Sequence, residues 1–84
     1  MPDSTHAEVH RGLAEIVHLV TGRPPEEVRP DRLFVDELRV DSLAMVETLE
    51  GAARRFDVLI DDEAAKEFVR VRDLVDHIAA RTAG

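Results

Sequence analysis

The chain has 84 residues, enough for one domain with one modest core but too few to enclose a substrate together with a full set of catalytic residues. Its 18 acidic and 11 basic residues give a formal net charge of −7, which repels nucleic acids and anionic lipid heads and attracts basic protein surfaces. Cysteine is absent, so the chain encodes no disulfide, thiolate metal site or thiol nucleophile. These limits favour a carrier, adaptor or regulator over an enzyme.

The first six residues lack the basic and apolar blocks of a signal peptide, and no apolar run approaches the length of a membrane span. We therefore expect a cytoplasmic protein that binds no nucleic acid, does not insert into membranes and acts as a monomer.

The first helix is predicted over residues 5–21. Thr5 and Glu8 have the spacing of a capping box, which marks a helix start. Apolar residues then recur at three- and four-residue steps, and Gly22 before Pro24 marks the end.

A long connection, residues 22–41, contains three prolines and follows the first helix. A structureless loop of this length is unusual inside a compact domain, so we expect it to lie in an ordered path over the core. Pro25 is suited to the first position of a helical turn over residues 25–28. The apolar side chains expected to anchor the loop are Leu33, Phe34, Val35 and Leu38.

Asp41 or Ser42 is suited to cap a second helix, predicted over residues 42–55. The apolar residues that keep helical spacing along it are Leu43, Val46, Leu49, Ala53 and Phe56.

Two further helices are predicted after it. The acidic run 61–63 suits the positive end of a short third helix over residues 62–68, and an apolar stripe indicates a fourth helix over residues 71–80. We therefore predict an all-α fold, a small four-helix bundle with a long ordered loop between helices 1 and 2 and a short helix 3, forming a single domain over residues 1–84.

Ser42 stands where the loop ends and the second helix begins. Its hydroxyl is expected to be exposed beside unpaired backbone amides at the positive end of the helix, which is a favourable place for a phosphate. We expect Leu43 to turn into the core and to fix the direction in which Ser42 projects. The pair Asp41–Ser42 is also what an ordinary helix N-cap contains, and the residue types alone leave both interpretations open.

The stretch Phe34 to Leu43, with the sequence FVDELRVDSL, resembles the signature of acyl carrier proteins, with Ser42 at the modified position. The similarity covers nearly all of the chain and is greatest with the discrete carriers of fatty acid synthesis in actinobacteria. The resemblance implies that a phosphopantetheinyl transferase moves 4′-phosphopantetheine from coenzyme A onto Ser42, that Asp41 and Leu43 flank the site, and that the chain is not itself an enzyme.

An acyl chain on such an arm needs shelter from water, because each buried methylene stabilises by about 0.8 kcal/mol. The residues expected to line an acyl cleft, in addition to ordinary core packing, are Val46, Leu49, Ile60, Phe68, Val71 and Val75. Met45 is expected to be either an exposed partner contact or peripheral packing.

The resemblance also implies that the second helix meets basic patches on acyl-loading, ketosynthase and other synthase enzymes. The acidic residues that match this docking face are Glu47, Glu50, Asp61, Asp62 and Glu63. Charge steering raises encounter rates and fixes orientation, which suits a carrier that visits several enzymes.

The chain departs from the usual pattern of the family at several positions. Arg54 and Arg55 stand where acidic residues are common, and Arg39 stands where glycine is frequent. Asp61 stands where the pattern has proline. These differences bear on the conformation of the loop and on the choice of partner enzyme.

Four histidines offer little metal-binding potential. His6 and His10 are four residues apart, but no third ligand is evident near them, so we predict no metal site. His18 and His77 are interpreted as surface or interface residues.

The predicted function is therefore to carry acyl intermediates as thioesters in fatty acid or polyketide biosynthesis. Two alternatives remain: a carrier of an aminoacyl or other activated acid, and an unmodified acidic module that acts as an adaptor or regulatory subunit.

Overall fold

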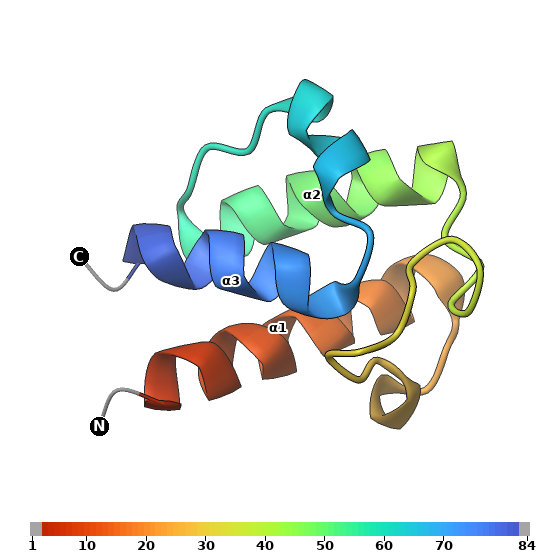
Figure 1. The fold of residues 1–84 in the computed structure, drawn as a ribbon, viewed down its shortest axis with the longest axis horizontal. Coiled ribbons are helices and arrows are strands. Elements are labelled where there is room, and N and C mark those ends of the chain that lie inside the picture. Colours follow the sequence, from red (N-terminus) through yellow and green to blue (C-terminus); the bar gives the residue numbers. More distant parts are fainter. Residues whose placement is uncertain (1–2, 83–84) are drawn as a thin grey trace.

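The computed structural model describes residues 3–82. Residues 1–2 and 83–84, the ends of the predicted single domain, lie outside the described part. The described chain is helical, and its only bridge of β type joins the isolated residues Leu33 and Arg70. Its elements in chain order are α1 (Asp3–Thr21), the 3₁₀ helix η1 (Pro25–Glu27), α2 (Ser42–Phe56), the 3₁₀ helix η2 (Asp62–Glu67) and α3 (Val71–Thr82) (Figure 1).

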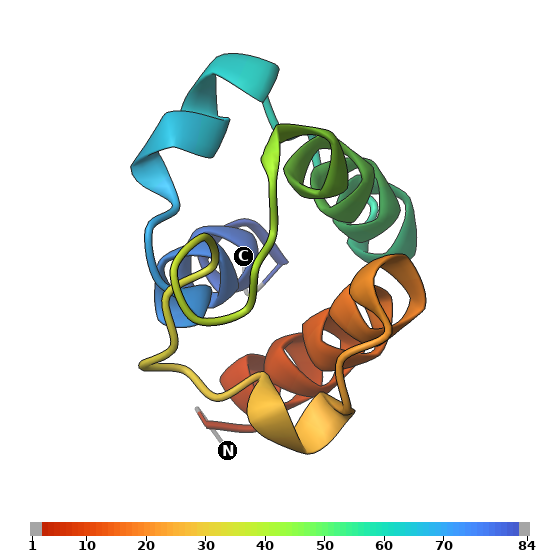
Figure 2. The ribbon, with the colours of Figure 1, turned by 90° about the vertical axis from the view of Figure 1, so that its right-hand side faces the viewer.

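The α-helix α1 packs against both other α-helices, and α2 and α3 each run antiparallel to it (Figure 1). η2 lies beside α2 on the side away from α1, as both views show (Figure 2). The core is made of aliphatic side chains with Phe34 and Phe68, and its most deeply buried large members include Leu13, Phe34, Leu38, Leu49, Leu74 and Ile78.

α1 begins at Asp3, two residues before the predicted start. Thr5 therefore lies within the first turn and is not the N-cap, so the proposed capping box with Glu8 is wrong. Several residue types that commonly start helices follow one another at positions 3–5, and the pattern does not choose among them. The predicted end at Thr21 is confirmed, and Gly22 follows with φ of +82°.

α2 buries a face that only partly matches the predicted one: Leu49 is buried as predicted, and Ala53 and Phe56 are half-buried. Its buried residues are Met45, Thr48, Leu49 and Ala52, whereas Leu43 is 68% exposed and Val46 is 36% exposed. Thr48 can occupy a core position because its hydroxyl donates to the Ala44 carbonyl oxygen at 2.8 Å. The apolar pattern therefore placed Leu43 and Val46 too far inward and missed Thr48, whose polar group is satisfied locally.

The segment predicted as a third helix is a 3₁₀ helix, with i→i+3 hydrogen bonds from Ala64 N to Asp61 O (3.0 Å) and from Phe68 N to Ala65 O (3.2 Å). Short helical segments commonly adopt this tighter form. The described part of the chain thus has three α-helices, not four. α2 ends at Phe56 and α3 at Thr82, one and two residues beyond their predicted ends.

The long loop before α2 is ordered, and the predicted turn at Pro25 is confirmed as η1. Phe34 and Leu38 are buried and anchor it as predicted, whereas Val35 is 64% exposed and Leu33 is half-buried. The backbone also contributes, because Phe34 N donates to Val69 O (3.0 Å) and Val71 N donates to Arg32 O (3.0 Å). These bonds tie the loop to the start of α3.

No helix in residues 3–82 combines the length and the continuous apolar surface that crossing a bilayer requires.

Candidate functional site

Ser42 is the first residue of α2, and its side chain is exposed. The preceding Asp41 is the N-cap: its backbone is extended, and its carboxylate accepts a hydrogen bond from Ala44 N at 2.8 Å. The capping role that the sequence left open between the two residues therefore belongs to Asp41. No hydrogen bond of the Ser42 hydroxyl occurs within residues 3–82, so this group is available for chemistry.

The orientation of Ser42 depends on two buried neighbours. Val40 is 1% exposed, and its N–H donates to Phe34 O at 2.8 Å. Met45 is buried at the start of α2, and its N–H donates to Asp41 O at 2.8 Å. The prediction that Leu43 turns into the core is wrong, because that residue points into solvent while Val40 and Met45 hold the helix start from either side.

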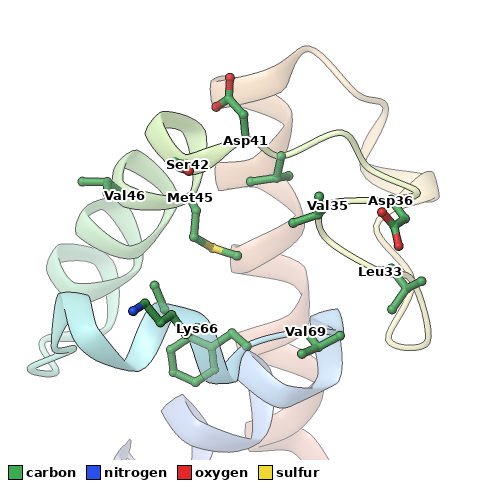
Figure 3. Close-up of a pocket in the computed structure, with 12 residues that line it drawn as sticks. Leu33, Val35, Asp36, Asp41, Ser42, Met45, Val46, Lys66 and Val69 are labelled. Atoms are coloured by element: carbon green, nitrogen blue, oxygen red, sulfur yellow. The ribbon is translucent and has the colours of Figure 1, made fainter.

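A half-open cleft of about 660 Å³ lies directly beside Ser42. Its walls come from the start of α2, the loop before it, and the segment from η2 to α3 (Figure 3). The apolar residues that line it are Leu33, Val35, Val40, Met45, Val46, Ala65, Phe68 and Val69. The polar residues are Asp36, Asp41, Ser42 and Lys66. The cleft is thus mainly apolar, and the exposed hydroxyl is at its edge.

The structure divides the predicted acyl-cleft residues into two groups. Val46 and Phe68 line the cleft beside Ser42. Leu49, Val71 and Val75 are buried in the core, and Ile60 is half-buried against it.

Several residues that line the cleft were not predicted to do so from the sequence, including Met45, Val69 and Lys66. The loop residues Val35 and Asp36 were also missed as lining residues, since the pattern indicated only anchoring. No local pattern in the sequence marks these residues, because they come from separate elements that meet only in the folded chain.

Arg39, three residues before Ser42, has φ of +60°. This left-handed region suits glycine and costs other residues roughly 1 kcal/mol or more. The conformation gives a physical reason for the glycine that the family resemblance led us to expect at this position.

The predicted docking residues come from two parts of the surface. Glu47 and Glu50 are exposed along a second groove, between α2 and α1, which also contains Leu19 and Arg54. Asp61 and Glu63 are exposed where the chain enters η2, and the side chain of Asp62 lies outside what the structure describes. Charges of both signs therefore line α2.

Arg54 and Arg55 differ in their surroundings. Arg55 forms an ion pair with Glu15 of α1, with Nη1 to Oε1 at 2.7 Å. Arg54 is exposed and takes part in no ion pair found within residues 3–82. At this end of α2 Arg54 therefore adds positive charge to the surface, whereas the charge of Arg55 is balanced by that of Glu15.

The histidines serve structural contacts. The Nε2 of His10 hydrogen-bonds the Val28 carbonyl oxygen and so joins α1 to the loop. His6 lies 3.2 Å from Asp76 of α3, and His18 contacts the Arg23 carbonyl oxygen at 2.8 Å. Within residues 3–82, the structure brings together no three His, Cys, Asp or Glu residues that could hold a metal ion.

Comparison with known proteins defines the class of protein to which this helical fold and exposed serine belong. Residues 11–78 match the family described as "Phosphopantetheine attachment site". Members of this family bear covalently attached 4′-phosphopantetheine.

The chain belongs to the acyl carrier protein family. It is 45% identical over 75 residues to the acyl carrier protein of Acidothermus cellulolyticus, covering 89% of each chain. It is 42% identical over 71 residues to that of Thermobifida fusca, covering 84% of this chain and 90% of the relative. It is also 43% identical over 75 residues to the meromycolate extension acyl carrier protein of Mycolicibacterium smegmatis, covering 89% and 76%. Acyl carrier proteins are carriers and not catalysts, and similarity to actinobacterial members agrees with the resemblance in the sequence.

Proposed function

We propose that Ser42 is the attachment point of 4′-phosphopantetheine and that the protein carries acyl intermediates on that arm in fatty acid or polyketide biosynthesis. The observation that carries the proposal is the exposed Ser42 hydroxyl at the first position of α2, beside an apolar cleft. The bound group supplies a terminal thiol, which holds the acyl cargo as a thioester. Ser42 is then a modified residue and has no catalytic role.

The surroundings of Ser42 fit a phosphodiester. The N–H groups of Ser42 and Leu43 belong to the first turn of α2 and have no acceptor within the helix. The positive end of the helix dipole lies at the same place and favours a negative charge. The Asp41 carboxylate accepts from the N–H of Ala44, and no hydrogen bond described for residues 3–82 is donated by the N–H groups of Ser42 and Leu43, so these remain available to a phosphate.

The cleft beside Ser42 fits an acyl chain. Val46 and Phe68 are the two predicted cleft residues that line it, together with Met45 and the loop residue Val40. Each methylene that moves from water into such a cleft stabilises the carried state by about 0.8 kcal/mol. Leu49, Ile60, Val71 and Val75 support the walls from within the core, where a longer chain would have to displace them.

We further propose that the carrier acts as a cytoplasmic monomer and meets a phosphopantetheinyl transferase, acyl-loading enzymes, a ketosynthase and other synthase enzymes. The exposed acidic residues of α2 and of the chain entering η2 support the proposed partner enzymes, because negative charge favours partners with basic patches. The mycobacterial relative is named as an acyl carrier protein of meromycolate extension, and that name supports the acyl assignment for this chain.

Intact mass spectrometry tests the attachment site. The protein is incubated with coenzyme A and a promiscuous phosphopantetheinyl transferase, and we expect a gain of one phosphopantetheine group per chain. Ser42→Ala abolishes the gain. Ser4→Ala is the matched control, because Ser4 is the only other serine in the chain, and it keeps the gain. An unmodified wild-type protein would contradict the proposal and favour the acidic adaptor.

A further inference from the structure

The cleft beside Ser42 contains one cationic side chain, Lys66 of η2. It lies on the wall opposite the start of α2, so that an acyl chain entering from Ser42 passes between the two walls (Figure 3). Lys66 is exposed, and among the side chains that the structure describes, which do not include that of Asp62, none of the ion pairs or hydrogen bonds involves its ammonium group. An ammonium group has three N–H donors, so Lys66 brings a charged donor to the wall of a cleft that is lined mainly by apolar side chains.

The other charges of the cleft lie on different elements from Lys66. Asp36 is on the loop and Asp41 is at the start of α2 (Figure 3). The cleft is thus negative on the side of the loop and α2 and positive on the side of η2. The two carboxylates and the net charge of −7 repel an anionic cargo and so oppose the attraction that Lys66 exerts on it. A neutral carbonyl oxygen avoids that repulsion and can still accept a hydrogen bond from the ammonium.

A carbonyl oxygen on the acyl chain would lose its hydrogen bonds to water on entering a wholly apolar cleft, and that loss opposes binding. Lys66 changes this balance by offering a charged donor at the wall. A fully reduced chain gains nothing from the ammonium and is held by apolar contacts alone. We propose that Lys66 makes this cleft selective for acyl chains that carry a keto oxygen near the thioester, and that Lys66 is the residue that determines this specificity.

This inference rests on the proposed attachment at Ser42 and is tested with a matched pair of cargoes. The octanoyl and 3-oxooctanoyl derivatives of coenzyme A, which differ by one keto oxygen, are each transferred onto the protein by a promiscuous phosphopantetheinyl transferase. The melting temperature is then compared between the loaded and the unloaded protein. We expect the 3-oxo cargo to raise the melting temperature of the wild type by more than the octanoyl cargo does, and an equal or smaller shift would contradict the proposed selectivity.

Two variants separate the donor from the rest of the side chain. Lys66→Met keeps an unbranched apolar side chain and removes the donor, so the shift produced by the 3-oxo cargo falls clearly below that of the octanoyl cargo. Lys66→Arg keeps a cationic donor and restores most of the 3-oxo shift. The octanoyl shift stays close to that of the wild type in both variants. Lys66 is exposed, so the unloaded variants are expected to melt near the wild type.

Failure of the two proposals gives different results. If mass spectrometry finds no transfer of either derivative onto Ser42, the proposed function fails. If both derivatives are transferred and Lys66→Met lowers the two shifts equally or leaves both unchanged, the carrier assignment stands and the role of Lys66 is overturned.

Discussion

His77 of α3 meets the aromatic ring of Phe68 edge-on, with the ring centroids 5.0 Å apart and the planes at 69°. Phe68 lines the cleft beside Ser42, so His77 supports one cleft wall from behind. The Nδ1 of His77 lies 3.3 Å from Nη1 of Arg81, and its Nε2 is buried with no hydrogen-bond partner. Because a guanidinium only donates, we assign the proton of the neutral ring to Nε2.

Stability is expected to fall on acidification through His77. Burial, and secondly the nearby Arg81 charge, lower the pKa of His77 below its usual 6.5, while Glu67 acts in the opposite direction. The unfolded chain therefore binds more protons than the folded one once the pH drops to about 6.5. As the pH falls from about 6.5 through the lower pKa of folded His77, the free energy of unfolding decreases. Above about pH 6.5 the stabilising contribution of neutral His77 is fully present.

Urea denaturation of the wild type and of His77→Gln between roughly pH 5 and pH 8 measures this contribution. The variant is expected to show a shallower loss of stability on acidification than the wild type. His18→Gln is the control, since His18 is exposed and lies outside the contact with Phe68. Parallel pH profiles for the wild type and His77→Gln would refute the assignment.

Asp41 is expected to stabilise the start of α2 through its carboxylate. Asp41→Ala removes the acceptor of the Ala44 N–H and should lower the free energy of unfolding by about 1 kcal/mol. Asp41→Asn keeps a side-chain oxygen at the same place and should cost less. Both are measured by urea denaturation, and equal losses in the two variants would argue against capping as the cause.

Arg39 should be a site where glycine stabilises the protein. Its φ of +60° is unfavourable for a residue with a Cβ atom and unstrained for glycine. Arg39→Gly is expected to raise the free energy of unfolding by about 1 kcal/mol, partly offset by the greater freedom of glycine in the unfolded chain. Arg39→Ala removes the same exposed side chain and keeps the unfavourable backbone, so it should show no such gain.

The elements that the sequence predicted well are those that local chemistry determines. The end of α1 at Thr21 before Gly22, the turn at Pro25 and the presence of a cap within the pair Asp41–Ser42 all depend on residues next to one another in the chain. The burial of Phe34 and Leu38 was also predictable, because apolar residues in a long loop need a core to cover.

The features that were missed depend on residues far apart in the chain. Leu43 is exposed because of the way in which α2 packs against α1 and the loop. The spacing of apolar residues within α2 does not contain that information. The cleft combines the loop, α2 and the segment after η2, so Val35 and Lys66 become neighbours of one site only in the folded chain. The exposed Ser42 was predicted as a site because its place at the start of a helix and a family resemblance both pointed to it.

Phe34 should contribute far more to stability than its neighbour Val35. Phe34 is completely buried, and Phe34→Ala is expected to lower the free energy of unfolding by about 3–5 kcal/mol, since it opens a cavity under the loop. That loss can exceed the stability of a small domain, so Phe34→Leu, with a smaller cavity, keeps the effect measurable. Val35→Ala is the matched control, and it should change stability by about 0.5 kcal/mol or less because that side chain is mostly in solvent.

Glu50 on α2 tests whether docking depends on one face of the protein or on its total charge. Glu50→Lys and Glu8→Lys change the net charge equally, but Glu8 is exposed on α1 and Glu50 is exposed on α2. At low salt, kcat/KM for transfer of phosphopantetheine by a transferase with a basic docking surface should fall several-fold for Glu50→Lys and little for Glu8→Lys. High salt should bring the two values together, because exposed charges are then screened. If both variants lose activity alike, long-range attraction to the net negative charge accounts for recognition, and the α2 face has no specific part in it.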